Sequence, residues 1–210
     1  MQKFINAWFK CNKGPGETHK VIFIFFSVAL GPVSSGPGVP GIASEAMSKS
    51  RRITEALQHY AETHDGHYPA GNSSTEIFQV LLDSHEIAYP ELFWAEGVPG
   101  KQRPKSSGLT PENVCFDVTV PLEAGSSSDL PLVFLTGYRV NYVSTGKAIP
   151  LPSSRDHTWM VVGYQNRSAC VVWRRSSNPD RPIMDPDGSV QNFVPKSFSG
   201  IPNYYRQLTP

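Results

Sequence analysis

Apolar and polar positions alternate with a helical period between residues 43 and 64. Apolar or small residues recur every three or four positions, which places them on one face of an α-helix. The predicted packing face of this helix is Met47, Ile53, Leu57 and Tyr60. The opposite, polar face is predicted to carry Lys49, Arg51, Arg52, Glu55, Gln58 and Glu62. Asp65-Gly66 and then Pro69 follow, which is the signal of a helix C-terminus.

A second, shorter helix is predicted for about residues 74–84. Ser73 and Glu76 stand three positions apart, as in a capping box, and a short apolar stripe follows them. From Pro111 onward the pattern changes to β-prone runs separated by Gly, Pro and Ser. The predicted strands are 113–120, 132–136, 138–143, 158–164 and 169–174, with 189–194 as an edge strand. We expect 132–136 to pair with 138–143, and 158–164 with 169–174, as two hairpins.

This order of elements predicts an α+β fold. An N-terminal apolar segment is followed by a long amphipathic helix, which packs on a C-terminal antiparallel β-sheet. The chain has 210 residues, enough for one domain with a core and an additional N-terminal segment. We therefore expect residues 1–41 to form a basic leader, an apolar signal or anchor and a Gly/Pro joint. Residues 42–210 are expected to form a single α+β domain.

The N-terminal apolar run is uncharged and is preceded by four lysines, an order typical of a signal or an inside-facing anchor. The predicted membrane segment is Val21, Ile22, Phe23, Ile24, Phe25, Phe26, Val28 and Leu30. A membrane-spanning helix needs about 20 apolar residues, so this run is short for one. Three interpretations stay open: a secretory signal cleaved after Ser35, an uncleaved anchor extended toward Ile42, or a buried strand in a cytosolic protein.

Composition narrows the class of partner. The net charge is +1 and charged residues make up 18% of the chain, so no strong field favours nucleic acid, and we expect no nucleic-acid partner. The 17 glycines and 19 prolines indicate a loop-rich, mostly β body.

Two cysteines in strand-like segments allow two interpretations. Cys115 and Cys170 would form one disulfide if the body lies outside the cytoplasm. They would otherwise be buried thiols that behave as small hydrophobic side chains.

The candidate metal site is a calcium loop with Asp185 and Asp187 as oxygen ligands. Alternate carboxylates followed by Gly188 suit a hard cation, although no acidic residue closes a twelve-residue loop, and an Asx turn is the alternative. His64 and His67 beside Asp65 form a second candidate metal pair, with helix-end capping as the alternative. Beyond calcium, we expect no cofactor.

Two strings carry a resemblance to a known family. They are Ala-Leu-Gln-His-Tyr-Ala-Glu-Thr-His-Asp-Gly-His-Tyr-Pro at 56–69 and Leu-Thr-Pro-Glu-Asn-Val at 109–114. In these strings and in element order, the chain resembles the pseudopilin-like proteins of bacterial type II secretion systems and type IV pili, the protein G-like or prepilin-type group. The family's N-terminal Gly-Phe-Thr-Leu-Ile-Glu type cleavage string is not present, and prolines interrupt the apolar run.

The resemblance implies a non-enzymatic structural or assembly protein of the bacterial cell envelope, without catalytic residues. Its body would be anchored to the inner membrane through the N-terminus, or be periplasmic or secreted. Its partners would be other pilin-like subunits or secretion-system components. Some protein G-like members bind calcium in a C-terminal loop, which the resemblance extends to Asp185 and Asp187.

Two other functions remain as alternatives. A secreted or periplasmic binding module would present Trp94, Trp159, Trp173 and Tyr164 as an aromatic platform for a sugar or peptide. A hydrolase would use Cys115 as nucleophile with His157 as base and Asp156 to orient it, and would need these side chains within hydrogen-bond reach.

Overall fold

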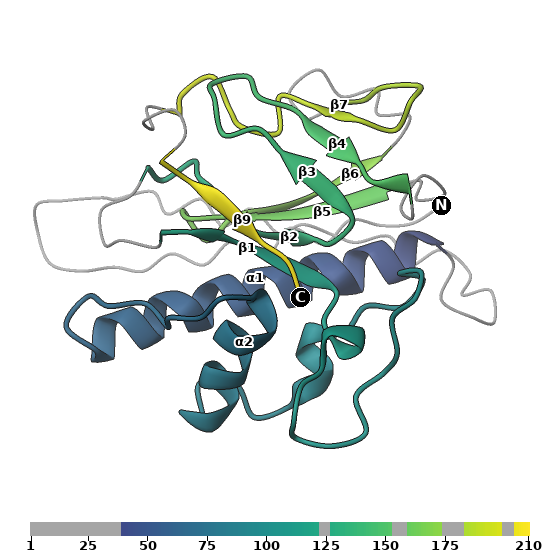
Figure 1. Ribbon diagram of the computed structural model, residues 1–210. Helices are drawn as coiled ribbons and strands as arrows, with labels where there is room; N and C mark the ends of the chain where they lie inside the picture. The colour runs from purple at the N-terminus through teal and green to yellow at the C-terminus, as the bar shows by residue number, and fades with distance from the viewer. Residues whose placement is uncertain (1–38, 122–126, 153–158, 174–182, 199–203) are drawn as a thin grey trace, which may run out of the picture. The chain divides into compact units, whose positions relative to one another are not determined.

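The computed structural model describes residues 39–121, 127–152, 159–173, 183–198 and 204–210, which fall in the unit Pro37–Pro210 (Figure 1). The predicted membrane segment from Val21 to Leu30 therefore lies outside the described residues, as do Cys11, Asp156 and His157.

Helices precede strands, and this part of the chain has an α+β fold (Figure 1). The helices are α1 (Val39–Thr63), α2 (Ser74–Asp83) and the short 3-10 helices η1 (Pro90–Phe93) and η2 (Pro111–Asn113). The strands are β1 (Phe116–Val120), β2 (Pro131–Leu135), β3 (Tyr138–Val140), β4 (Ala148–Pro150), β5 (Trp159–Tyr164), β6 (Ala169–Trp173), β7 (Ile183–Met184), β8 (Val190–Gln191) and β9 (Arg206–Leu208). Within the described residues they form two antiparallel sheets, ordered β6-β5-β2-β1-β9 and β3-β4-β8-β7. The single sheet that we predicted is thus divided in two.

The long helix α1 begins four residues before the predicted start, at Val39. Pro40 and Gly41 fall in its first turn, where the missing N–H of proline leaves no helical hydrogen bond unmade. Its end agrees with the prediction. Asp65 and Gly66 adopt positive φ angles of 54° and 81°, and the Gly66 N–H donates to the Ala61 carbonyl at 2.8 Å.

The predicted apolar face of α1 packs on β5, β6 and β2. Ile53 and Leu57 are fully buried there, and Met47 and Tyr60 are partly buried against the same core. The prediction is wrong for Gln58, which was placed on the polar face but is only 9% exposed. Part of the core therefore lies between α1 and the five-stranded sheet, and the same cluster continues to Ala148, Val190 and Phe193.

Helix α1 approaches β5 most closely at Gly163. A Cβ atom at this position would lie 2.8 Å from Thr54 Oγ1 and 3.3 Å from the Ser50 carbonyl oxygen. Ser50 and Thr54 are both fully buried, and the Thr54 hydroxyl donates to the Ser50 carbonyl at 3.0 Å. Small side chains with internal hydrogen bonds thus allow the helix and the strand to come close without leaving the Thr54 hydroxyl unpaired.

The predicted N-cap of α2 is confirmed. Ser73 Oγ accepts the Glu76 N–H at 3.2 Å, and the Glu76 carboxylate accepts the N–H of Asn72 at 2.7 Å. The apolar side of α2 packs against η1, where Phe78 and Phe93 stack with ring centroids 4.6 Å apart.

Of the two predicted hairpins, only β5–β6 is confirmed, with Val162 opposite Cys170. The hairpin predicted for 132–136 and 138–143 is wrong. Strand β2 pairs with β1 and β5, whereas β3 pairs with β4 in the other sheet. Gly137, whose φ is 99°, stands at the point where the chain leaves the first sheet. The C-terminal strand β9 was not predicted, and it pairs with the outer edge of β1.

Candidate functional site

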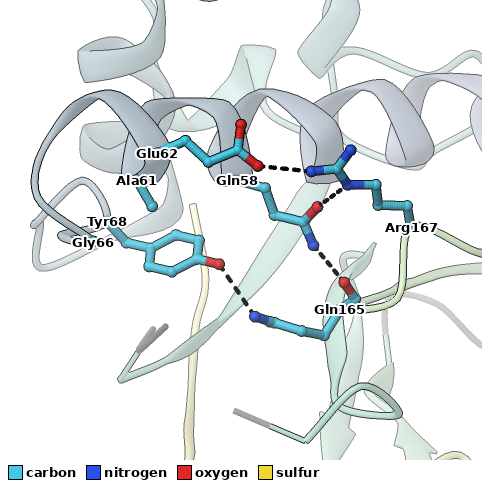
Figure 2. Close-up of a pocket in the computed structure, with 7 residues that line it drawn as sticks. All are labelled: Gln58, Ala61, Glu62, Gly66, Tyr68, Gln165 and Arg167. Carbon is cyan, nitrogen blue, oxygen red and sulfur yellow. Dashed lines mark hydrogen bonds and ion pairs between the residues drawn. The ribbon is translucent and has the colours of Figure 1, made fainter. Parts of the chain in front are cut away.

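The first candidate site lies where the C-terminal end of α1 meets the turn between β5 and β6 (Figure 2). It encloses a pocket of about 280 Å³. The lining residues are Gln58, Ala61 and Glu62 of α1, Gly66 and Tyr68 just after it, and Gln165 and Arg167 of the turn. The site includes part of the 56–69 string that carries the family resemblance.

Hydrogen bonds between side chains close this junction, which we call the helix clasp and define as Gln58, Glu62, Tyr68, Gln165 and Arg167. Gln58 donates to the Gln165 carbonyl through Nε2 and accepts from Arg167 Nε through Oε1. Arg167 Nη2 donates to Glu62 at 2.9 Å, and Gln165 Nε2 donates to the Tyr68 hydroxyl at 3.1 Å (Figure 2). The clasp therefore joins the helix end to a turn more than one hundred residues later in the chain.

The β5–β6 turn aims Arg167 at the helix. The Asn166 side chain accepts the Ser168 N–H at 2.9 Å, and the Arg167 N–H donates to the Tyr164 carbonyl at 3.0 Å. Arg167 has a φ of 64°, in the left-handed region that costs a non-glycine residue about 1 kcal/mol. Its bonds to Gln58 and Glu62 help to offset this cost.

Electrostatics keep the clasp phenol neutral. Burial raises the pKa of Tyr68, and the charge of Glu62 raises it further, while the Gln165 hydrogen bond and Arg167 lower it. The Gln165 Oε1 atom is buried and has no hydrogen-bond partner among the described residues. The clasp thus offers two amides, a neutral phenol and an ion pair. These groups can hold the polar groups of a ligand in position by hydrogen bonds.

A second candidate site is a groove along the outer face of α1, which we call the α1 groove. It has a volume of about 890 Å³ and is bounded on its other side by residues 85–92 and Arg103. Its acidic side chains are largely paired. Lys49 lies 2.7 Å from Glu45, and His59 Nδ1 lies 2.6 Å from Glu86. The groove presents both signs of charge.

Asp185 and Asp187, the predicted calcium ligands, lie in the turn between β7 and β8. Asp187 Oδ1 accepts both the N–H and the hydroxyl of Ser189 at 2.9 Å, and these bonds lower the pKa of Asp187. Asp185 accepts from Ser189 and Gln191 and lies 3.6 Å from Lys147 Nζ. These contacts make the turn an Asx turn, in which both carboxylates already have protein donors.

The predicted histidine pair is not assembled into a metal site. His64 Nδ1 lies 2.8 Å from the Tyr60 carbonyl, and its ring stacks on Tyr60 with centroids 3.8 Å apart. Across the part of the chain that the structure describes, no three His, Cys, Asp or Glu residues gather where they could hold a metal ion.

One residue of the predicted aromatic platform, Trp159, is buried and cannot present its ring to a ligand. Trp159 is only 5% exposed and sits opposite Trp173 across the β5–β6 hairpin, and burial raises the pKa of Tyr164 well above its ordinary value. Trp94 follows η1, where Lys49 Nζ and the Arg103 guanidinium lie 5.5 and 6.0 Å from its ring centroid.

The predicted disulfide is also wrong, because no bond joins Cys115 to Cys170. The register aligns Cys170 with Val162, Phe134 and then Asp117, so three strand spacings, about 14 Å, separate β6 from β1. A disulfide needs its Cα atoms within about 7 Å. Cys115 is buried, and burial raises the pKa of its thiol to about 11. Its proposed catalytic partners, His157 and Asp156, lie outside the described residues.

Sequence reasoning missed the residues with the most unusual environment. Asp117 is fully buried on β1, and burial raises its pKa to about 7. Gln207 of β9 donates to its carboxylate at 2.6 Å. Asp117 and Thr119 alternate with apolar neighbours, which usually indicates that their side of the strand faces solvent. This pattern did not indicate that a second sheet covers these side chains.

No helix within the described ranges is long and apolar enough to cross a membrane. No protein-family model matches the chain, and no curated protein or solved structure is similar enough to count as a match.

Proposed function

We propose that this protein is a non-enzymatic, pseudopilin-like subunit of a bacterial envelope assembly, related to type II secretion or type IV pilus systems. In this function it works by packing and membrane partitioning. The helix α1 is the stalk, the two sheets form the head, and residues upstream of α1 connect the head to the inner membrane. The partners are other pilin-like subunits or secretion-system components.

The observation that carries the proposal is the way α1 is joined to the head. The helix has 25 residues, and its apolar face packs on β5, β6 and β2. The helix clasp fixes its C-terminal end to the β5–β6 turn. A helix held at its face and at its end transmits position and force from a membrane segment to a head as one rigid piece.

The outer face of α1 supports contact with neighbouring subunits. Its own sheet already covers Ile53 and Leu57, so these residues are not free to pack against other helices. The α1 groove, with exposed Ser48 and Arg52, belongs to the accessible side of the helix. We therefore assign contacts between subunits to the α1 groove.

Fractionation and cysteine cross-linking test this function in cells that make the full chain with a C-terminal tag. Protein with Ser48→Cys should enter the envelope fraction and form a covalent dimer under mild oxidation, because the groove faces a neighbour. Lys105→Cys is the matched control, since this exposed loop position lies outside the groove. Both variants carry Cys11→Ser, which removes the cysteine upstream of α1.

Recovery of the protein in the cytosol with an intact N-terminus would overturn the envelope assignment. Envelope recovery with equal cross-linking at positions 48 and 105 would leave the location standing and refute the groove as the contact surface.

A further inference from the structure

The C-terminal strand β9 connects the two sheets through a single side chain. Gln207 Nε2 donates to Asp117 of β1 at 2.6 Å and to the Tyr138 carbonyl of β3, and Gln207 Oε1 accepts the Val140 N–H at 3.2 Å. Asp117 and Gln207 therefore belong to one polar cluster between the two sheets, while β9 pairs with the edge of β1.

The carboxyl group at the centre of this cluster is in an environment that disfavours its charge. Asp117 is fully buried, and its Oδ1 atom has no hydrogen-bond partner that the geometry identifies. Burial raises its pKa to about 7, against the lowering effects of Thr136, Gln207 and Lys101. A neutral carboxylic acid suits this site, whereas a carboxylate there needs water or a cation.

The charged and titratable groups around Asp117 do not neutralise it. Lys101 is the cation whose charge acts on it, but the Lys101 ammonium donates to the Pro111 carbonyl at 2.7 Å. From the segment after β3, the Tyr142 phenol is buried and bonded to Thr119 at 2.8 Å. Arg139 of β3 and Arg206 of β9 are exposed. Within the described residues, no salt bridge reaches Asp117.

Strand β9 is held on one side only. It contributes three residue pairs at the edge of the sheet, and no strand among the described residues pairs with its other side. Strand β2, the other neighbour of β1, is held on both sides by β1 and β5. Releasing β9 removes Gln207 from Asp117 and admits water without breaking the central strands, as expected for local opening at a sheet edge.

We propose that β9 is a pH-sensitive latch between the two sheets, closed while Asp117 is protonated and released when Asp117 ionises. In the closed state Gln207 holds β1 and β3 together. In the open state the edge of β1 and the hydrogen-bonding groups of β3 are exposed. This device does not depend on the proposed envelope function.

Hydrogen–deuterium exchange of the full chain between pH 5 and pH 9 tests the latch. Protection factors, corrected for the intrinsic pH dependence of exchange, are compared for the peptide 204–210 and for β5–β6. We expect protection of 204–210 to fall about tenfold for each unit between about pH 5 and pH 7, where only the closed state holds the proton, and to level off above pH 7. Protection of β5–β6 should stay within about twofold over the same range.

Two variants separate Asp117 from other titrating groups. Asp117→Asn should make the protection of 204–210 independent of pH, because the amide cannot ionise. Glu112→Gln is the matched control, since this carboxyl group is exposed on a nearby loop, and it should keep the wild-type profile. Gln207→Leu should leave 204–210 weakly protected at every pH.

Three results would overturn the proposal. They are a flat profile in the wild-type protein, a parallel loss of protection in β5–β6, and an unchanged pH dependence in Asp117→Asn. If Asp117→Asn does not fold, the wild-type profile with its β5–β6 reference still decides between the latch and a global effect.

Discussion

The helix clasp and the cluster around Asp117 each place a glutamine and a carboxylate between distant parts of the chain. Gln58 bonds to a residue 107 positions away, and Gln207 bonds to Asp117 across 90 positions. In the clasp, the carboxylate of Glu62 is exposed and paired with Arg167. In the cluster, the carboxyl group is buried, and no cation among the described residues forms an ion pair with it.

The difference shows how solvent decides what a polar junction does. An exposed ion pair is screened by water and salt, so it contributes little to stability and positions the helix end at low cost. A buried acid without a cation responds strongly to pH, because its charged form loses hydration that the protein does not replace. The clasp is therefore expected to be insensitive to pH near neutrality, and the cluster to be sensitive.

The largest effect is expected from Asp117→Asn. The folded pKa of about 7 lies above the ordinary value of 3.8, so the folded state holds a proton that the unfolded state loses. The stabilisation is complete below about pH 4 and is lost as the pH rises through 7, a change of up to about 4 kcal/mol in unfolding free energy. Denaturant unfolding at pH 4 and pH 8 should show this change in the wild-type protein but not in the variant. An equal change in unfolding free energy between the two pH values in both proteins would exclude Asp117 as its source.

Gly163→Val should disturb the packing of α1 on β5 without touching the Asp117 cluster. The added side chain meets Thr54 Oγ1 and the Ser50 carbonyl, so α1 must move away from β5, at a cost of about 3 kcal/mol. Gly108→Val is the matched control, because its Cβ would have no neighbour within 4 Å. Thermal unfolding measures the difference. A Gly163→Val protein as stable as the control would mean that α1 tolerates a larger separation from the sheet.

Replacing each glutamine by leucine compares the two junctions directly. Gln207→Leu leaves the buried Asp117, the Tyr138 carbonyl and the Val140 N–H without their partly buried partner, so we expect a loss of about 2 kcal/mol at pH 5. Gln58→Leu should cost about 1 kcal/mol, because water can replace its partners at the exposed turn. Urea unfolding of both variants provides the comparison, and equal losses would contradict the assigned difference in solvation.

The smallest effect is expected from Glu62→Gln. The side chains of Glu62 and Arg167 are 60% and 54% exposed, so breaking their ion pair should cost less than about 1 kcal/mol. The difference from wild type should shrink further in 1 M salt. Melting temperatures at low and high salt measure both changes. A large loss that salt does not reduce would place this pair in a drier environment than its exposure indicates.

Much of the fold could be predicted from local pattern. The apolar period of α1, the Asp65-Gly66 helix end and the Ser73 cap each act within a few residues, so the sequence specifies them directly. The β5–β6 hairpin is equally local, since a short polar turn joins its strands. The candidate site could be predicted only in part. The helix-end string marked its place, but nothing near Arg167 indicated that this side chain would meet Glu62.

The sequence by itself determined the two main helices, most strands of the five-stranded sheet, and which side of α1 is apolar. Only the tertiary structure decided that β2 and β3 belong to different sheets, that β9 returns to the edge of β1, and that Asp117 is buried. The physical reason is that a strand's alternation records which side chains share a face, whereas pairing and covering depend on segments far along the chain. Asp117 and Thr119 share a face as the pattern requires, and the sheet that covers this face is formed by later residues.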